Sequence, residues 1–293
     1  MEKIRKNKKV IAVFLIPAVL IYLCFELIPV VMSVYFSFND WPGLQAVPLK
    51  FVGFKNYSNL FHNAVFLKSL QNVLIYVVVS VILQVPIGFG LGLLIHHFKK
   101  GQRFFKAAFF IPMILSVTAV ALLWNFIYFP TDKGILNSLL IKIGLGNYIQ
   151  QWLVNPKTSL ICLIVVSTWT SVGYYMIICL AGLTSIPDSV LEAGELDGAT
   201  GWKKIWNLYI PMLWEPLKMS TIMVITGVLK IFDTVYILTP TGGTSNCTIV
   251  PALLMYNEAY RYGHYGTGSA IATVIFVLSA AVSIFSLKLM NQK

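Results

Sequence analysis

The sequence predicts an all-α polytopic membrane protein with six transmembrane helices. Of its 293 residues, 57% are hydrophobic and only 11% are charged, and the mean hydropathy is +0.77. A typical soluble domain is about 45–50% apolar and about 25% charged. A globule of this size cannot hide so much apolar surface from water. These values exclude soluble enzymes, nucleic-acid-binding modules and disordered scaffolds, and they point to the bilayer as the solvent.

The apolar residues gather in six long runs. Each run holds roughly the 20 residues that a tilted helix needs to cross the hydrocarbon layer. The runs are continuous rather than alternating, which excludes a transmembrane β-barrel. They cover residues 10–35, 70–95, 104–128, 160–183, 211–235 and 268–289.

The first run follows a basic tail and resembles a secretory signal peptide in that respect. Its apolar stretch is too long, and no small-residue cleavage site follows it, so we interpret it as a retained helix. The predicted organisation is then a basic tail, a first transmembrane helix, an outer loop, a five-helix core and a short C-terminal tail. These parts cover residues 1–9, 10–36, 37–69, 70–289 and 290–293.

The distribution of basic residues predicts the orientation. The net charge is +11. With the N-terminus inside, the inner segments hold 13 Lys and Arg residues and the outer segments hold seven. Basic residues collect on cytoplasmic loops, so both termini are expected in the cytoplasm. The four cysteines show no metal-ligand spacing, and three of them lie inside apolar runs, which is typical of small buried side chains. No internal repeat supports an inverted-repeat transporter.

One cytoplasmic loop, residues 186–213, has an unusual composition. It holds four of the eleven acidic residues of the chain. Pro187 and Asp188 are typical of a helix start, and Gly198 and Gly201 interrupt the segment. We predict two short amphipathic helices joined by a glycine bend, outside the membrane. An interfacial helix resting on lipid is the alternative, although its acidic residues would then face a negatively charged leaflet.

The spacing within this loop matches a known motif. The residues are Glu192-Ala193-Gly194, then Asp197-Gly198-Ala199, then Ile205 and finally Ile210-Pro211. This pattern resembles the EAA loop of the membrane permeases of ATP-binding cassette importers. The chain departs from the usual alanine at Gly194 and from the usual leucine at Ile210.

The resemblance extends over nearly the whole chain. It narrows to the sugar permeases similar to the larger maltose-type subunit, in their shorter six-span form. It implies a type I importer permease fold in a bacterial cytoplasmic membrane, with residues 70–289 as the permease core. The matching stretches outside the loop include Phe104-Phe105-Lys106, Phe110, Pro112, Trp124, Gly134, Asn137, Phe232-Asp233, Leu238-Thr239, Gly242-Gly243, Tyr256, Ala259-Tyr260, Gly266 and Ala270.

The resemblance also implies a mechanism. The EAA loop forms a coupling helix that docks on an ATPase subunit, and the membrane cavity alternates between facing out and facing in. Glu192 would meet a basic or backbone donor on the ATPase, and Gly198 would let the chain turn where no side chain fits. Simple helix capping is the alternative role for Glu192. The coupling residues implied are Glu192, Ala193, Gly194, Asp197, Gly198 and Ala199.

The chain is not expected to be an enzyme. It contains no GxxxxGK[ST] sequence, so ATP and Mg²⁺ are expected on a separate ATPase chain. This chain is expected to bind no cofactor or metal. The partners implied by the resemblance are a second homologous permease, an ATPase dimer, an extracellular solute-binding protein, a sugar and the lipid bilayer. Nucleic acid is not among them.

The fourth apolar run carries a polar stretch that suggests a translocation path. Polar residues within a span usually face the bundle interior. The candidates for sugar contact are Ser167, Thr170, Ser171 and Tyr174. In the maltose-type subunit that the chain resembles, the fifth span contributes further sugar contacts. The matching positions here offer no hydrogen-bonding side chain: Val224, Gly227, Val228 and Ile231. Helix packing through the Ser and Thr hydroxyls is the alternative.

Two other functions are the alternatives to the importer. An ion-coupled secondary transporter would use Glu26, Lys230 and Asp233 as a charge relay, and Lys230 and Asp233 are close enough in sequence to pair. A membrane-embedded enzyme would need an intramembrane cluster of His, Asp and Glu, which the sequence lacks. Neither rival explains the acidic loop broken by glycines.

Overall fold

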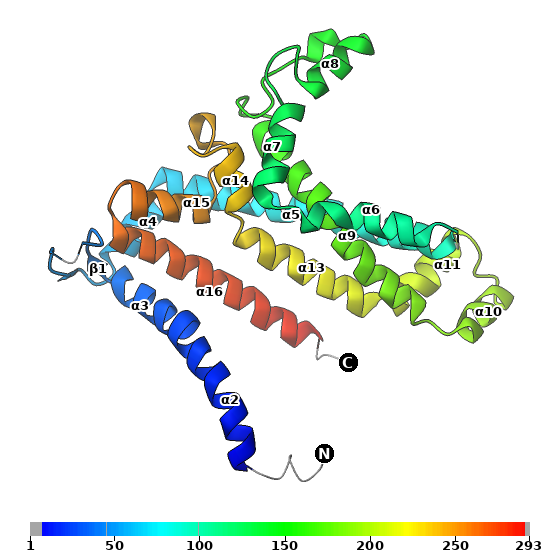
Figure 1. Ribbon diagram of the computed structural model, residues 1–293, viewed down its shortest axis with the longest axis horizontal. Helices are drawn as coiled ribbons and strands as arrows, with labels where there is room; N and C mark the ends of the chain where they lie inside the picture. Colours follow the sequence, from blue (N-terminus) through cyan, green and yellow to red (C-terminus); the bar gives the residue numbers. More distant parts are fainter. Residues whose placement is uncertain (1–7, 45, 99, 291–293) are drawn as a thin grey trace. The chain divides into compact units, whose positions relative to one another are not determined.

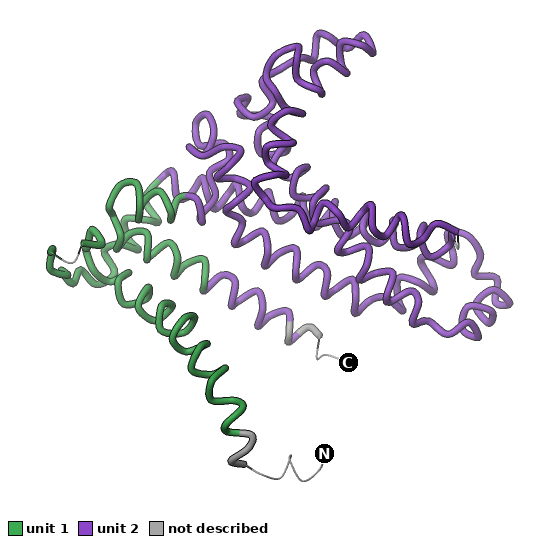
Figure 2. The backbone as a smooth tube through the Cα atoms, viewed as in Figure 1, with its two compact units in different colours: residues 1–63, 254–276 green, residues 64–253, 277–293 purple. Residues whose placement is uncertain are grey.

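The computed structural model describes residues 8–44, 46–98 and 100–290. The predicted tails therefore lie largely outside the described residues, since 1–7 and 291–293 are not among them. The chain divides into two compact units (Figure 2), one of residues 1–63 and 254–276 and the other of residues 64–253 and 277–293. Apart from one short hairpin, the regular elements are helices (Figure 1).

The first unit begins with one long helical stretch. A π-helical turn joins its two α-helical parts, because the N–H of Ile28 bonds to the carbonyl of Leu23. Two antiparallel strands of two residues each follow, with Asn39 opposite Phe51. The elements are α2 (Lys8–Tyr22), η1 (Leu23–Leu27), α3 (Ile28–Ser37), β1 (Asn39–Asp40), β2 (Lys50–Phe51), α4 (Lys55–His62), η5 (Asn257–Arg261) and the first part of α16 (Tyr265–Met290).

A buried polar network closes the end of α3. The Asn56 amide donates to the carbonyls of Ser37 and Asn39 at 2.8 and 3.0 Å. The hydroxyls of Ser37 and Tyr57 lie 2.6 Å apart. Buried polar groups are stable only when paired in this way. The predicted outer loop is thus an ordered structure at its start.

The second unit is a bundle built on α5 and α9. Its elements are α5 (Ala64–His97), α6 (Gln102–Ile114), α7 (Val117–Ile127), α8 (Ile135–Lys142), η2 (Gly146–Tyr148), α9 (Ser159–Thr184), α10 (Asp188–Leu196), α11 (Trp202–Lys204), η3 (Ile205–Tyr209), α12 (Ile210–Met212), α13 (Trp214–Leu229), α14 (Asp233–Leu238), η4 (Thr244–Asn246) and α15 (Pro251–Tyr256), which crosses into the first unit, and the end of α16.

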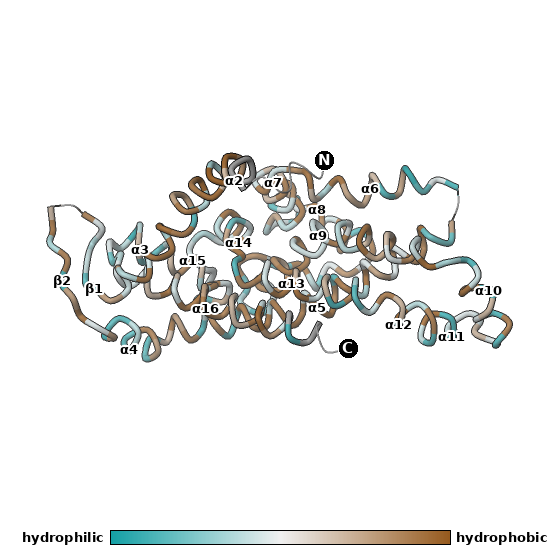
Figure 3. Tube along the Cα trace, turned by 90° about the horizontal axis from the view of Figure 1, so that it is seen from below, coloured by the Kyte–Doolittle hydropathy of each residue, from teal (hydrophilic) through white to brown (hydrophobic). Residues whose placement is uncertain are grey.

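The long helix α5 packs along α9, and both α6 and α13 pack against this pair. Tyr76 on α5 is fully buried, and its hydroxyl donates to the Leu163 carbonyl at 2.9 Å. Asn72 donates to the carbonyls of Asn246 and Ile249 and so fixes a later loop on α5. Half of the apolar window of α9 is buried, whereas none of the window of residues 12–37 is. Helix α9 is therefore the core of this unit, and the first span leaves its apolar surface for lipid or another chain. Figure 3 shows how hydrophobic α2 is.

The number of predicted spans agrees with the structure. Within the described residues, four helices are long and apolar enough to cross a membrane, and two bent helix pairs bring the number to as many as six. The first, second, fourth and sixth predicted runs each fall on one of the four unbroken candidate spans. Helix α5 begins at Ala64, six residues before the predicted start of its span.

The third predicted run is not one straight helix. Helices α6 and α7 meet at an angle of 98°. Leu115 is extended, and the Ser116 hydroxyl caps α7 by accepting the N–H of Ala119 at 3.2 Å. Serine is a favoured N-cap because its oxygen satisfies a free N–H of the first turn. The run is uniformly apolar across this break, which is why hydropathy predicted a single helix.

The fifth predicted run is also broken. The helical stretch that ends at Met212 meets α13 at 73°, and α13 ends at Leu229. A new helix begins at Asp233. Lys230 and Asp233, whose spacing would allow them to pair, form no ion pair with each other among the described residues. The reason is that the two residues do not share a helix, so a spacing of three no longer brings their side chains together.

Candidate functional site

The acidic loop folds as predicted into two short helices around a glycine bend. Helix α10 begins at Asp188, directly after Pro187. Its side chains Val190 and Leu191 pack on a buried cluster at the ends of α9 and α12. The buried members of this cluster are Cys179, Leu183, Ile186 and Leu213. The first half of α10 is thereby anchored to the bundle.

The glycine bend is a Schellman motif that ends α10. The N–H of Ala199 bonds to the Gly194 carbonyl at 2.9 Å, and the N–H of Gly198 bonds to the Glu195 carbonyl at 3.0 Å. Gly198 has a φ of 79°, the left-handed conformation that this motif requires. Within the described residues, a Cβ on Gly198 would meet nothing within 4 Å. The expectation that no side chain fits at Gly198 concerns the docked ATPase and stays a prediction. The backbone conformation is the constraint.

Gly201 makes the second turn of the bend. The N–H of Lys203 bonds to the Thr200 carbonyl at 3.1 Å. Gly201 lies inside this turn with φ 54° and ψ −127°, the values of the first central residue of a type II′ turn. The chain then continues through α11, η3 and α12 as one helical stretch, residues 202–212, which we call the second arm of the loop.

The exposed face of α10 carries the motif residues. Glu192, Ala193 and Asp197 are exposed, and Leu196 is 89% exposed. Gly194 faces the second arm instead, where a Cβ would lie 3.3 Å from the Leu208 side chain. The helix-capping role for Glu192 was wrong, because α10 starts four residues earlier. Leu196 is therefore an exposed apolar side chain between the carboxylates of Glu195 and Asp197.

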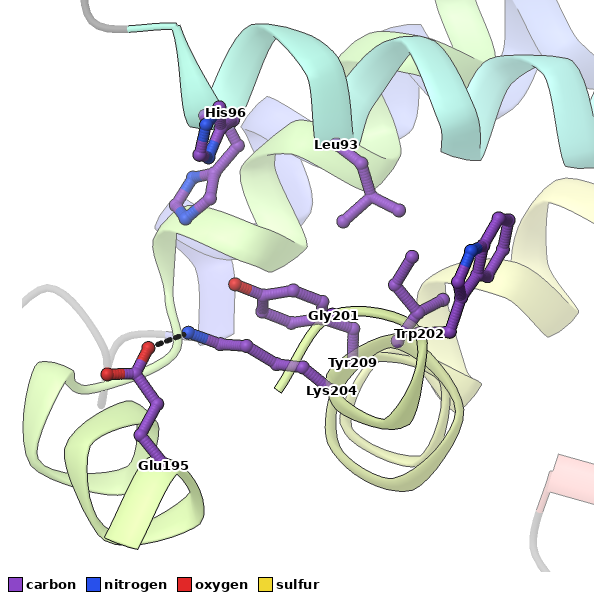
Figure 4. Close-up of a pocket in the computed structure, with 9 residues that line it drawn as sticks. Leu93, His96, Glu195, Gly201, Trp202, Lys204 and Tyr209 are labelled. Atoms are coloured by element: carbon purple, nitrogen blue, oxygen red, sulfur yellow. Dashed lines mark hydrogen bonds and ion pairs between the residues drawn. The ribbon is translucent and has the colours of Figure 1, made fainter. Parts of the chain in front are cut away.

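A cavity of about 510 Å³ lies between the two arms and the end of α5. Figure 4 shows Glu195, Lys204, Tyr209 and His96 around it. The Lys204 ammonium donates to Glu195 Oε1 at 2.6 Å and lies 5.6 Å from the centre of the Tyr209 ring. The hydrogen bond to Glu195 raises the pKa of Lys204. Sequence reasoning missed this pair, since its members are nine residues apart across a bend.

A second cavity, of about 220 Å³, brings the predicted path residues together. Ser167, Thr170 and Ser171 of α9 line it. All four apolar positions of the fifth run line the opposite wall: Val224, Gly227, Val228 and Ile231. Because helices α9 and α13 are brought together here, one wall of the cavity offers hydroxyls and the other offers apolar side chains.

The tyrosine at this cavity is not the predicted one. Tyr175 lines the cavity, whereas Tyr174 does not, and the Tyr174 hydroxyl donates to the sulfur of Met223 at 3.8 Å. The Ser167 hydroxyl lies 2.5 Å from that of Tyr76. The packing alternative for Ser167 therefore has a concrete partner. Thr170 bonds to the Val166 carbonyl of its own helix.

Gln84 of α5 was missed by sequence reasoning. It lines the same cavity and is 3% exposed. Its amide makes no hydrogen bond within the described part of the chain. Because Gln84 lines the cavity, its amide is available to a polar ligand there. The signal in the sequence was a single glutamine within an otherwise apolar run.

Metal binding finds no basis in the described residues, which contain no group of three or more His, Cys, Asp and Glu side chains placed to hold an ion. All four cysteines are free. Cys162, Cys179 and Cys247 are buried, as expected for small apolar side chains. The prediction was wrong for Cys24, which is exposed because η1 buries none of its residues.

Comparison with known proteins identifies similar chains. Residues 84–293 match the family described as the binding-protein-dependent transport system inner membrane component. The probable ABC transporter permease YurN of Bacillus subtilis is 36% identical over 288 residues, which is 97% of each chain. The lactose transport system permease LacF of Rhizobium radiobacter is 32% identical over 93% of this chain and 90% of its own length.

A solved structure has the same fold. It is a bacterial alginate ABC transporter in complex with a periplasmic protein that holds an alginate pentasaccharide. The TM-score is 0.84 with 20% identity, over 99% of this chain and 96% of the other. The agreement over nearly the full length of both chains confirms the predicted all-α fold class.

Proposed function

The chain belongs to the family of binding-protein-dependent transport system inner membrane components, and from this premise we propose that it is the permease subunit of an ATP-driven carbohydrate importer. The family is a transport component and has the type I importer permease fold, so the chain is a multi-pass membrane protein and not an enzyme. Family membership lends no support to the ion-coupled alternative.

The observation that carries the proposal is the geometry of the acidic loop. A helix anchored by Val190 and Leu191 presents Glu192 and Leu196 outward, and a Schellman glycine fixes its end. In our proposal α10 is the coupling helix. Glu192, Ala193 and Asp197 face the ATPase, while Gly194, Gly198 and Ala199 shape the loop. An exposed charged group beside an exposed apolar side chain gives both specificity and contact area in such a joint.

The substrate class rests on the relatives and on the cavity. One similar chain is named for lactose, and one similar structure is of an alginate transporter. The cavity between α9 and α13 offers Ser167, Thr170, Ser171 and the amide of Gln84 to sugar hydroxyls. Hydroxyl and amide groups can both donate to and accept from a sugar. The predicted contact of Tyr174 with sugar stays a prediction, since Tyr174 does not line this cavity.

Membership of this family supports the remaining subunits of the proposed importer. The proposed importer contains a second homologous permease, an ATPase dimer that binds ATP and Mg²⁺, and an extracellular solute-binding protein. The complex lies in a bacterial cytoplasmic membrane with both termini of this chain in the cytoplasm. The similar alginate transporter, solved with its periplasmic protein, supports the solute-binding partner.

A gentle detergent pull-down from native membranes tests the proposal. A C-terminal tag on this chain should bring down a second six-span chain and a P-loop ATPase, identified by mass. Recovery of this chain alone, or only of copies of itself, would contradict the importer and direct work to ion-gradient assays.

Glu192→Lys is expected to lower ATP-driven uptake at least about tenfold, because it removes one partner of a charged contact and leaves the other unpaired at an interface. Insertion should not change, since Glu192 is exposed. Uptake into vesicles and the amount of co-purified ATPase measure the effect. Asp188→Asn, at the anchored start of α10, is the matched control. Wild-type uptake by the Glu192→Lys protein would show that Glu192 makes no important contact with the ATPase.

Gln84→Leu is expected to raise the half-saturating sugar concentration for uptake about two- to tenfold, the effect of losing one neutral hydrogen bond. The two side chains have similar size, so packing should be kept. Tyr174→Phe is the comparison, since the Tyr174 hydroxyl reaches Met223. A change only in Tyr174→Phe would place the sugar beside Tyr174 and not Gln84.

A further inference from the structure

The two arms of the acidic loop are joined by an ion pair. Glu195 lies in the last turn of α10, and Lys204 lies at the start of the second arm. The ammonium of Lys204 and the carboxylate of Glu195 are 2.6 Å apart, a charge-assisted hydrogen bond. The two glycines of the bend, Gly198 and Gly201, lie between them in sequence. The pair therefore bridges the glycine bend and joins α10 to the second arm (Figure 4).

The backbone of the bend alone does not hold α10 and the second arm in place relative to each other. The first half of α10 packs on the bundle through Val190 and Leu191. The second half meets the second arm where Gly194 faces Leu208 and where Glu195 meets Lys204. The Gly194 contact is between a glycine and a flexible leucine tip, so it limits approach but resists separation weakly. The ion pair resists separation.

Lys204 is itself held in place on the bundle side. Its side chain is only 18% exposed, although that of Glu195 is 55% exposed. It lies over the ring of Tyr209, and a ring face attracts a cation. Tyr209 packs on the buried cluster that contains Leu213, where the second arm turns into α13. A continuous path of contacts thus runs from α10 through Lys204 and Tyr209 to the base of α13.

We propose that Glu195 and Lys204 form a strut that makes α10 and the second arm move as one body. This inference rests on the proposed function and adds two positioning residues to it. When the ATPase displaces α10, the strut carries the displacement to α13, one wall of the cavity that holds Ser167 and Gln84. Without the strut, the glycine bend absorbs part of the motion.

The strut is expected to act on coupling more than on folding. An ion pair at this exposure changes an equilibrium by at most about fivefold. Glu195→Gln and Lys204→Met should therefore leave the amount and the melting temperature of the protein nearly unchanged. The ratio of sugar transported to ATP hydrolysed should fall up to about fivefold.

The experiment uses the whole importer reconstituted in vesicles with its ATPase and solute-binding protein. Lys203→Met is the matched control, since Lys203 is an exposed neighbour outside the ion pairs of the described residues. The reversed pair, Glu195→Lys with Lys204→Glu, should recover at least half of the lost ratio. If the reversed pair fails to assemble, the double variant Glu195→Gln/Lys204→Met decides. It should fall no further than either single variant, because one strut is lost only once.

Single variants with the wild-type ratio would overturn the strut. So would a double variant whose loss is the product of the two single losses, since the two residues would then act independently. Failure of the proposed function looks different. In that case the wild-type chain itself would show no ATP-dependent uptake and would bring down no ATPase.

Discussion

Gly198→Pro is expected to abolish ATP-driven sugar uptake while the protein remains inserted in the membrane. Proline fixes φ near −65°, and Gly198 has a φ of 79°. Proline also lacks the N–H that bonds to the Glu195 carbonyl. Both hydrogen bonds of the Schellman motif depend on this geometry, so α10 should unravel or swing away from the second arm. Uptake into vesicles and the amount of co-purified ATPase measure the loss.

A graded series separates conformation from volume at this position. Alanine in the left-handed region costs about 1–2 kcal/mol, so Gly198→Ala should impair uptake partly. Asparagine tolerates this region better than alanine does, so Gly198→Asn should impair it less. Gly90→Ala is the control, since Gly90 lies within α5 with ordinary helical φ and open space around it. If asparagine impaired uptake more than alanine, the free volume at the docked ATPase would matter more than φ.

Gly173→Val is expected to prevent assembly of the bundle. A Cβ on Gly173 would clash with the carbonyl oxygen of Phe109. Helix α6 therefore approaches α9 closely because position 173 has no side chain. The obstacle is backbone, which cannot rotate away as a side-chain tip can. Overpacking within a core costs about 1–3 kcal/mol for added methylene groups, and a backbone collision of this kind should exceed that range. The fraction of monodisperse protein in detergent measures the result.

Gly173→Ala completes this test. It should lower the melting temperature clearly, while Gly90→Ala should leave it unchanged or raise it slightly, because alanine is the better helix former. Binding of the ATPase should be affected only in proportion to the folded fraction. A Gly173→Ala protein with the wild-type melting temperature would show that α6 shifts without cost, and the close approach would then carry no stability.

Several properties followed from local patterns in the sequence. The six apolar runs predicted the spans, since transfer into the bilayer depends on each segment's own composition. The acidic loop was predicted as two helices around a bend, because Pro187 fixes its own φ at the helix start and Gly198 and Gly201 admit the turns that other residues disfavour. The same spacing carried the resemblance to the EAA loop. These features need no knowledge of what packs where.

Other properties were decided only by the tertiary structure. The breaks at Leu115 and Leu213 lie within stretches that are apolar enough to be counted as part of a span, so hydropathy does not mark them. Tyr175 rather than Tyr174 lines the cavity because of how α9 is rotated about its axis against α13. Adjacent residues of a helix point in directions about 100° apart. Gln84 and the Glu195–Lys204 pair acquire their roles from partners on other elements. A contact between two elements depends on their relative placement, which no single stretch of sequence encodes.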